Sequence, residues 1–172
     1  MNRTKQITIA LGLAAALTGV AARLTAEQSA QVVQVRDDCD PATFNAAVGD
    51  GTCIGDGDTT FADFLAEVTA NQSAEKWRFN PDRMSEPRRV VAQNRGGETH
   101  TFTRVAAFGG GVVPLLNDLS GNPDVAPECI DGAKFGASVV PPGASLPVNS
   151  VAGGDKFQCC IHPWMRTTVR KR

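Results

Sequence analysis

The sequence contains only two histidines, His100 and His162, among 172 residues. Oxidases and reductases that hold several copper ions need more than two imidazole ligands, so the histidine count excludes that class of enzyme. The three glycines at positions 109–111 are not followed by the lysine and the serine or threonine of a phosphate-binding P-loop. We therefore expect neither a small-molecule substrate nor an enzymatic activity.

The first 26 residues lack the features of a membrane anchor or a lipoprotein. The apolar run from Ile7 to Ala22 is short for a membrane span, no cysteine follows it, and no Arg-Arg pair precedes it. A basic start, an Ala-rich apolar run and small residues around Ala22 and Ala26 are typical of a secretory signal peptide. Residues 1–26 are therefore predicted to be a signal peptide for general secretion, and the protein to be secreted or periplasmic.

The chain also lacks an excess of basic charge. Residues 1–26 contain three basic residues and no acidic ones, so the remaining chain has 14 basic and 18 acidic residues, a net charge of −4. This balance disfavours a nucleic acid as partner. There are no internal repeats, and the length is that of one domain.

Most of the chain after Trp77 consists of short β-type segments separated by Pro- and Gly-containing turns. Their number, in a secreted chain that can form disulfides, predicts a mainly β fold, an antiparallel sandwich with Greek-key connections. The expected strands are 77–79, 88–93, 99–106, 137–140, 146–148, 156–160 and 166–169.

Residues 27–76 are predicted to form an N-terminal extension with short helices. Asp40 suits an N-cap, Pro41 the first helical position and Gly49 the stop of one helix. A second helix over 60–69 has one apolar face, which packs on the sheet or, alternatively, binds a partner. The apolar face of this second helix consists of Phe61, Phe64, Leu65 and Val68. The polar residues before the two helices form either a flexible start or an edge strand over 32–35.

Five cysteines are an odd number for a secreted chain, so at least one lies outside any disulfide. Cys39 and Cys53 flank the first expected helix, and we expect them to form a bridge. Cys129 and Cys160 form either a second bridge or two buried free thiols. Because neighbours on a strand point to opposite faces, Cys160 can turn away from the face on which Cys159 lies.

Residues 157–165, Phe-Gln-Cys-Cys-Ile-His-Pro-Trp-Met, place a thiolate, an imidazole and a thioether within seven residues. A trigonal site of two histidines and one cysteine, with a weak axial methionine, is typical of copper centres that transfer electrons. The second imidazole can only come from His100, which follows a glycine-containing turn. Pro163 fixes its backbone φ and stiffens the loop.

The pattern Cys-x-x-His-Pro-x-Met after an aromatic-containing strand, with an earlier Asn…His-Thr-Phe segment, resembles the type 1 (blue) copper cupredoxins, the family of plastocyanin and azurin. The short loop is similar to that of amicyanin. The resemblance covers roughly Trp77 to Val169, and we assign residues 77–172 to a cupredoxin domain. It implies a Greek-key sandwich that holds one copper ion, cycling between Cu(I) and Cu(II). The ligands that it implies are His100, Cys159, His162 and Met165.

A one-electron carrier of this kind needs redox partner proteins. We expect His162 to lie nearest the surface, with Trp164 and Pro163 forming an apolar docking patch that Leu115 and Leu116 extend. Core packing is the alternative role of Trp164. We expect the protein to be a monomer.

Alternatives remain open for both the ligands and the function. Cys160 can replace Cys159 as the thiolate ligand, and Glu98 is either a solvated turn residue or an additional oxygen ligand. A copper storage or delivery protein would use the same ligands without redox cycling. A secreted binding module without a metal would instead pair Cys159 with Cys160 or Cys129.

Overall fold

The structure is a computed structural model that describes residues 30–85, 87, 89–149 and 151–171. The predicted signal peptide lies outside these residues. In the part of the chain that is described, no helix has the length and apolar character needed to cross a membrane.

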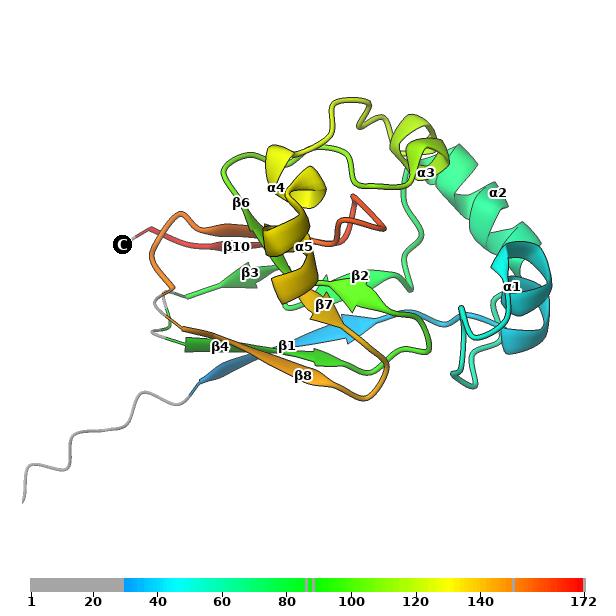
Figure 1. Cartoon of the computed structure of the whole chain (residues 1–172), viewed down its shortest axis with the longest axis horizontal. Helices are drawn as coiled ribbons and strands as arrows, with labels where there is room; N and C mark the ends of the chain where they lie inside the picture. The colour runs from blue at the N-terminus through cyan, green and yellow to red at the C-terminus, as the bar shows by residue number, and fades with distance from the viewer. Residues whose placement is uncertain (1–29, 86, 88, 150, 172) are drawn as a thin grey trace, which may run out of the picture.

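Two four-stranded sheets form the body of the molecule, and the mainly β sandwich with short helices is confirmed (Figure 1). The first sheet has the order β2-β1-β4-β8, formed by Arg78–Asn80, Gln31–Arg36, Arg89–Asn94 and Ser145–Asn149. The second has the order β3-β10-β9-β6, formed by Arg83–Met84, Arg166–Val169, Lys156–Gln158 and Thr103–Val105. A short pair joins β5 (His100–Thr101) to β7 (Val139–Val140).

The sheets are mixed rather than wholly antiparallel, because β1 pairs in parallel with β4 and β3 with β10. A strand is present over 32–35, as one of the two readings predicts, but β1 lies between β2 and β4, so both the flexible start and the edge position are wrong. Val33 and Val35 on this strand are fully buried, which is typical of an inner strand. A strand that precedes Trp77 therefore belongs to the same sheet as strands that follow it.

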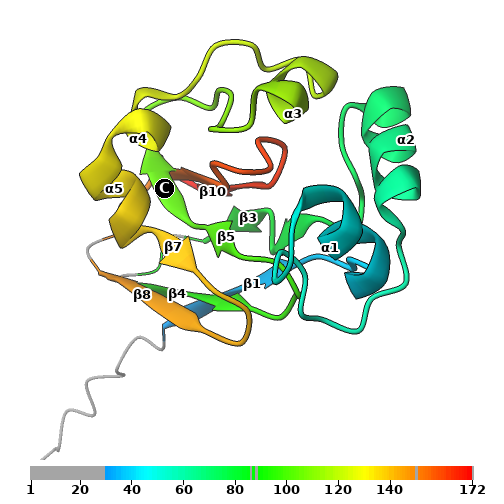
Figure 2. The same ribbon diagram turned by 45° about the vertical axis from the view of Figure 1, so that its right-hand side comes forward.

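Helices α1 (Pro41–Val48) and α2 (Phe61–Asn71) lie together at one end of the sandwich (Figures 1 and 2). The predicted N-cap is confirmed, since the Asp40 carboxylate accepts a hydrogen bond from the Thr43 N–H at 2.8 Å. Phe64 of α2 packs against Trp77 with ring centroids 4.6 Å apart, and Phe44 of α1 stacks on the same indole at 5.7 Å. The apolar face of α2 is thus part of the core, as the first of the two readings predicts.

Helix α3 (Pro114–Leu119) lies beside α2, whereas α4 (Pro127–Ile130) and α5 (Gly132–Ala137) lie together away from α1 and α2 (Figures 1 and 2). A disulfide from Cys129 in α4 to Cys160 fixes this region to the end of β9. The expected Cys39–Cys53 bridge is confirmed, and of the two states left open for Cys129 and Cys160 the bridge is the one present.

Asp38 connects the end of β1 to the segments before and after α2, because its carboxylate accepts hydrogen bonds from Thr59 and Lys76. Slight burial alone would raise the pKa of Asp38, but the hydrogen bonds from these donors have the larger effect and lower the pKa from 3.8 to about 2. We expect Asp38→Asn to cost less than about 1 kcal/mol of unfolding free energy, because the pair is partly exposed. The cost should be complete above pH 3.8 and disappear as the pH falls toward 2. Urea unfolding at several pH values, with the exposed Asp50→Asn as control, measures this difference.

Candidate metal centre

Two segments far apart in the sequence carry the expected ligands to one place. His100 begins β5, Cys159 directly follows β9, and His162 and Met165 lie in the loop that leads into β10. Thr101 joins the two segments: its N–H lies 3.4 Å from the Cys159 Sγ, and its hydroxyl accepts a hydrogen bond from the Cys160 N–H at 2.7 Å.

The predicted strand 99–106 is interrupted at this point. β5 pairs with β7, whereas β6 pairs with β9, and Phe102 between them donates its N–H to the carbonyl of Ser138. The change of partner lets His100 leave the sheet that contains β9 while β6 stays in it. The break in the strand therefore places the imidazole beside the end of β9.

The inner nitrogens of both histidines face the Cys159 sulfur. The Sγ atom lies 3.8 Å from the His100 Nδ1 and 3.9 Å from the His162 Nδ1, and the two nitrogens are 3.3 Å apart. A point equidistant from the three corners of this triangle lies about 2.1 Å from each, close to the 2.0–2.3 Å of metal bonds to imidazole and thiolate. All three side chains are buried, so the triangle has the size and composition of a trigonal metal site.

The fourth expected ligand, Met165, is buried in the same core cluster as Cys159. Its backbone closes the loop, because the Cys159 N–H donates to the Met165 carbonyl and the Met165 N–H donates to the His162 carbonyl, both at 3.0 Å. These bonds hold residues 159–165 in one tight turn. They fix the backbone of Met165 beside the strongest of the expected ligands.

The outer nitrogens of the histidines face carboxylates. The His100 Nε2 lies 2.7 Å from the Asp37 Oδ2, and the His162 Nε2 lies 3.7 Å from the Glu98 Oε2. Asp37 also accepts hydrogen bonds from the N–H groups of Gly97 and Glu98, and Glu98 accepts one from the Trp77 Nε1. A proton on each outer nitrogen leaves each Nδ1 with a free lone pair for a metal ion.

Burial opposes charge at this site, and the groups stabilise one another against it. The hydrogen bond and charge of His100 hold the pKa of Asp37 below 3.8 despite burial. Asp37 and Cys159 in turn raise the pKa of His100 from 6.5 to about 10, and both histidines lower that of the Cys159 thiol well below 9.0, although burial opposes both shifts. The two histidines therefore favour the thiolate form of Cys159, the form of cysteine that binds metals.

A buried turn holds the carboxylates in place. The Asn94 side chain donates to the carbonyls of Glu98 and Val140 at 2.7 and 2.8 Å and accepts from the Gly96 N–H at 2.9 Å. Gly97 is needed for close approach, since a Cβ there would lie 2.4 Å from the Gly55 nitrogen. The turn before His100 is thus a rigid part of the site.

Helix α2 covers His162, which is only 3% exposed. The ring centroids of Phe64 and Trp164 lie 6.1 and 5.6 Å from that of the imidazole. His162 is the most exposed of the four expected ligands, as predicted, but Phe64 of this helix closes the site on that side. Leu116 is buried as well, so it cannot extend an exposed patch, whereas Leu115 is 53% exposed.

Several open alternatives are settled by this geometry. Cys160 is bridged to Cys129, so the reading with Cys160 as ligand is wrong, as is a metal-free module that pairs Cys159. Glu98 is buried and accepts a hydrogen bond from Trp77, so its reading as a solvated turn residue is also wrong.

Asp37 is the residue of the site that sequence reasoning missed. The sequence pattern places Asp37 in a polar stretch after a flexible start or an edge strand, and neither position predicts a role in the site. The available signal was its position, directly after an alternating apolar segment and two residues before Cys39, which the first disulfide fixes.

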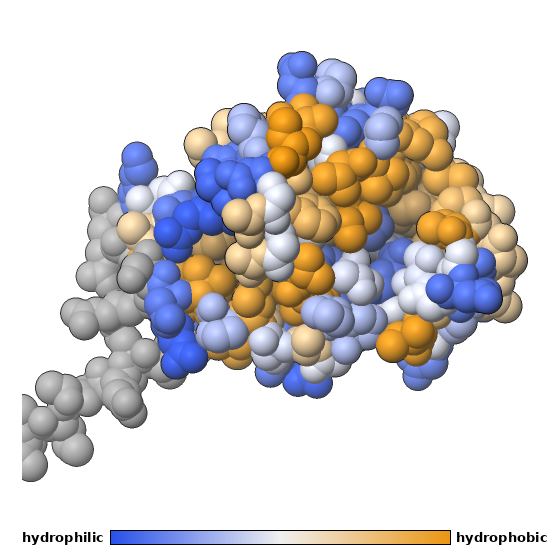
Figure 3. All heavy atoms as spheres, viewed as in Figure 1, coloured by the Kyte–Doolittle hydropathy of each residue, from blue (hydrophilic) through white to orange (hydrophobic). Residues whose placement is uncertain are grey.

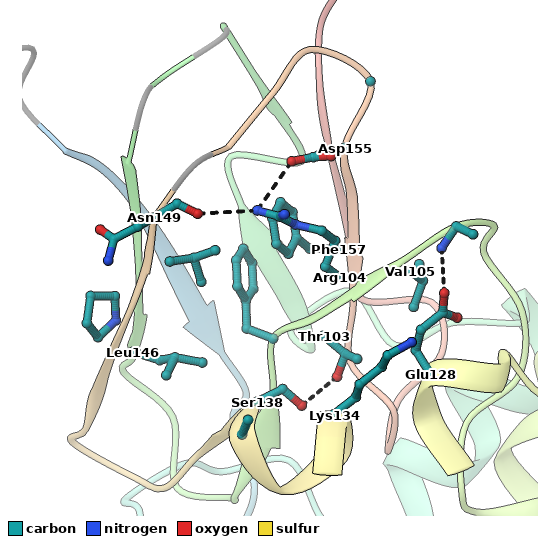
Figure 4. A pocket seen from close by; sticks show the side chains of 16 residues that line it. Thr103, Arg104, Val105, Glu128, Lys134, Ser138, Leu146, Asn149, Asp155 and Phe157 are labelled. Carbon is teal, nitrogen blue, oxygen red and sulfur yellow. Dashed lines mark hydrogen bonds and ion pairs between the residues drawn. The ribbon is translucent and has the colours of Figure 1, made fainter. Parts of the chain in front are cut away.

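A groove of about 720 Å³ lies apart from this cluster, between β6, β8 and α5 (Figure 4). Arg104 extends across it toward Asp155 at 3.4 Å and the Asn149 carbonyl at 3.5 Å, with its guanidinium over the Phe157 ring. None of the four expected metal ligands lines the groove. It is therefore separate from the metal centre.

No protein-family model matches the chain, and no curated protein matches it. Among solved structures, the chain is similar to the oxidised form of plastocyanin from Dryopteris crassirhizoma at 17% sequence identity. The match covers 82% of this chain and 99% of that chain, with a TM-score of 0.37. This likeness is too weak to support a conclusion about function, so the site is interpreted from its own geometry.

Proposed function

We propose that the protein is a one-electron carrier that holds a single copper ion with His100, Cys159, His162 and Met165. The observation that carries the proposal is the buried triangle of two Nδ1 atoms and one thiolate sulfur, whose centre lies about 2.1 Å from each atom. This donor set, two imidazoles and one thiolate with a methionine nearby, is the one that blue-copper centres use.

When copper is bound, it supplies the one-electron cycle between Cu(II) and Cu(I). Cys159 would hold the ion through its thiolate sulfur, His100 and His162 through their Nδ1 atoms, and Met165 would be the weakest of the four donors. Burial of all four excludes water from the centre. The hydrogen bonds across the loop keep the ligands in place in both oxidation states.

The proposed docking surface lies where the ligand loop reaches the outside of the molecule. Trp164 packs over His162 and is partly exposed, while Val112 and Leu115 nearby in the fold are 41% and 53% exposed. The Val112 N–H donates to the carbonyl of Cys160, which places this segment against the loop. Apolar side chains are visible over this end of the molecule, around α3 (Figure 3). A secreted redox protein would approach here, with Trp164 between it and the imidazole.

Copper reconstitution tests the proposal. Added Cu(II) should bind in one equivalent per chain and give an intense thiolate-to-copper absorption in the visible range, with the electron paramagnetic resonance signal of a single site. The centre should pass through repeated cycles of reduction and reoxidation. Tight, colourless binding of Cu(I) alone would favour the storage or delivery function instead.

Met165→Leu tests the weak ligand. We expect the visible thiolate band to persist, because the three strong ligands remain, while the reduction potential changes, because the axial ligand tunes it. Voltammetry measures the potential. Met84→Leu is the matched control, since Met84 is equally buried in β3 and has no role in the site. Equal shifts in both variants would remove Met165 from the ligand set.

A further inference from the structure

The two carboxylates behind the histidines are buried without a cation of their own. The side chain of Asp37 is fully buried and that of Glu98 is 9% exposed. Among the described residues, no lysine or arginine forms an ion pair with either one. Their partners are histidine rings, backbone N–H groups and the Trp77 indole. A buried charge is costly unless it is compensated, so these carboxylates need positive charge nearby.

The charges of the site balance best with a divalent ion. Asp37, Glu98 and the Cys159 thiolate carry three negative charges around two histidines that become neutral when their Nδ1 atoms bind a metal. With Cu(II) the net charge of the buried group is −1, and with Cu(I) it is −2. Because interactions between charges are strong in a water-excluded core, the carboxylates favour the state with less net charge.

We propose, on the basis of the proposed function, that Asp37 and Glu98 are positioning residues with two effects. Asp37 hydrogen-bonds the His100 Nε2 and so holds that ring with its Nδ1 turned toward Cys159, whereas Glu98 faces the His162 Nε2 at 3.7 Å and acts through its charge. Both carboxylates bias bound copper toward the oxidised state, giving the carrier a low reduction potential. A carrier with a low reduction potential gives up its electron readily to an electron acceptor. Both effects follow from carboxylates on the two outer nitrogens, at 2.7 and 3.7 Å.

Glu98→Gln is the sharpest test, because the amide keeps the shape of the side chain and its oxygen can still accept from Trp77. At a fixed ambient potential, we expect the Cu(I)/Cu(II) ratio to rise at least about tenfold, equal to about 59 mV for one electron. The matched control is Glu75→Gln, which removes the same charge from an exposed position two residues before Trp77. The control should change the ratio less than about twofold, because solvent screens the charge. Glu98→Asp, which retains the charge, should stay nearer the wild type than Glu98→Gln.

Asp37→Asn provides a second, independent variant, with the neighbouring Asp38→Asn as its control. It should raise the ratio in the same direction and, in the diamagnetic Cu(I) form, expose the His100 Nε2–H to faster solvent exchange in nuclear magnetic resonance spectra. If the copper centre forms but Glu98→Gln and Asp37→Asn shift the ratio no more than their controls, the inference is wrong. The same holds if wild type binds two copper ions per chain, because the carboxylates would then be ligands. If wild type forms no copper centre, the proposed function itself fails.

Discussion

Cys159→Ser is expected to abolish the visible copper band and to weaken copper binding by more than the roughly 100-fold that changes behind a ligand cause. Cys159 is the one cysteine of the five outside a disulfide, and its sulfur is the corner that both Nδ1 atoms face. A serine hydroxyl has nearly the same size but is a poor ligand for Cu(I), which prefers soft sulfur.

Stability measurements make the same prediction quantitative. At free copper about a thousand times the wild-type dissociation constant, binding stabilises the wild-type fold by about 4 kcal/mol, and the variant should lose more than about 2.7 kcal/mol of this gain at the same concentration. Thermal unfolding with and without copper measures it, and circular dichroism of the copper-free variant confirms that the fold persists. A Cys159→Ser protein that keeps the same coloured centre would show that the thiolate is not a ligand.

The ligand segments could be anticipated from the sequence because their information is local. Cys159, His162 and Met165 lie within seven residues, and only His100 was available as a second imidazole. The Cys39–Cys53 bridge could be anticipated because the two cysteines lie close together around one helix. The alternation of a strand allows Cys160 to turn away from Cys159, but it does not decide between a bridge to Cys129 and two free thiols. Helix α1 followed from its capping residues.

The environment of the ligands could not be anticipated, because it depends on contacts between distant segments. Asp37 reaches His100 only because β1 enters the sheet as an inner strand beside β4, which a run of valines with polar neighbours does not reveal. Helix α2 covers His162 through Phe64, whose apolar spacing predicts a buried face but not the residue beneath it. The proposed ligands are thus visible in the sequence, whereas the groups that surround them are brought together only by the fold.

Removing the Cys129–Cys160 bridge is the second change with a large expected effect. The Cys129→Ala/Cys160→Ala double variant should lose about 4 kcal/mol of unfolding free energy, since the bridge spans 31 residues of sequence. Cys39→Ala/Cys53→Ala, which opens a separation of 14, should lose about 3 kcal/mol. Urea unfolding of both variants under non-reducing conditions measures these losses.

The two bridges support different parts of the site, so the two double variants should change the copper centre in different ways. Cys160 donates its N–H to Thr101 beside the thiolate, so loss of its bridge should broaden the absorption and resonance signals of bound copper. Cys53 instead forms a β-bridge with Glu98, and Cys39 follows Asp37 by two residues. Loss of that bridge should therefore move the reduction potential more than the spectrum, because it loosens the carboxylates and leaves the ligands in place. Identical spectral changes in the two double variants would contradict this division between ligands and carboxylates.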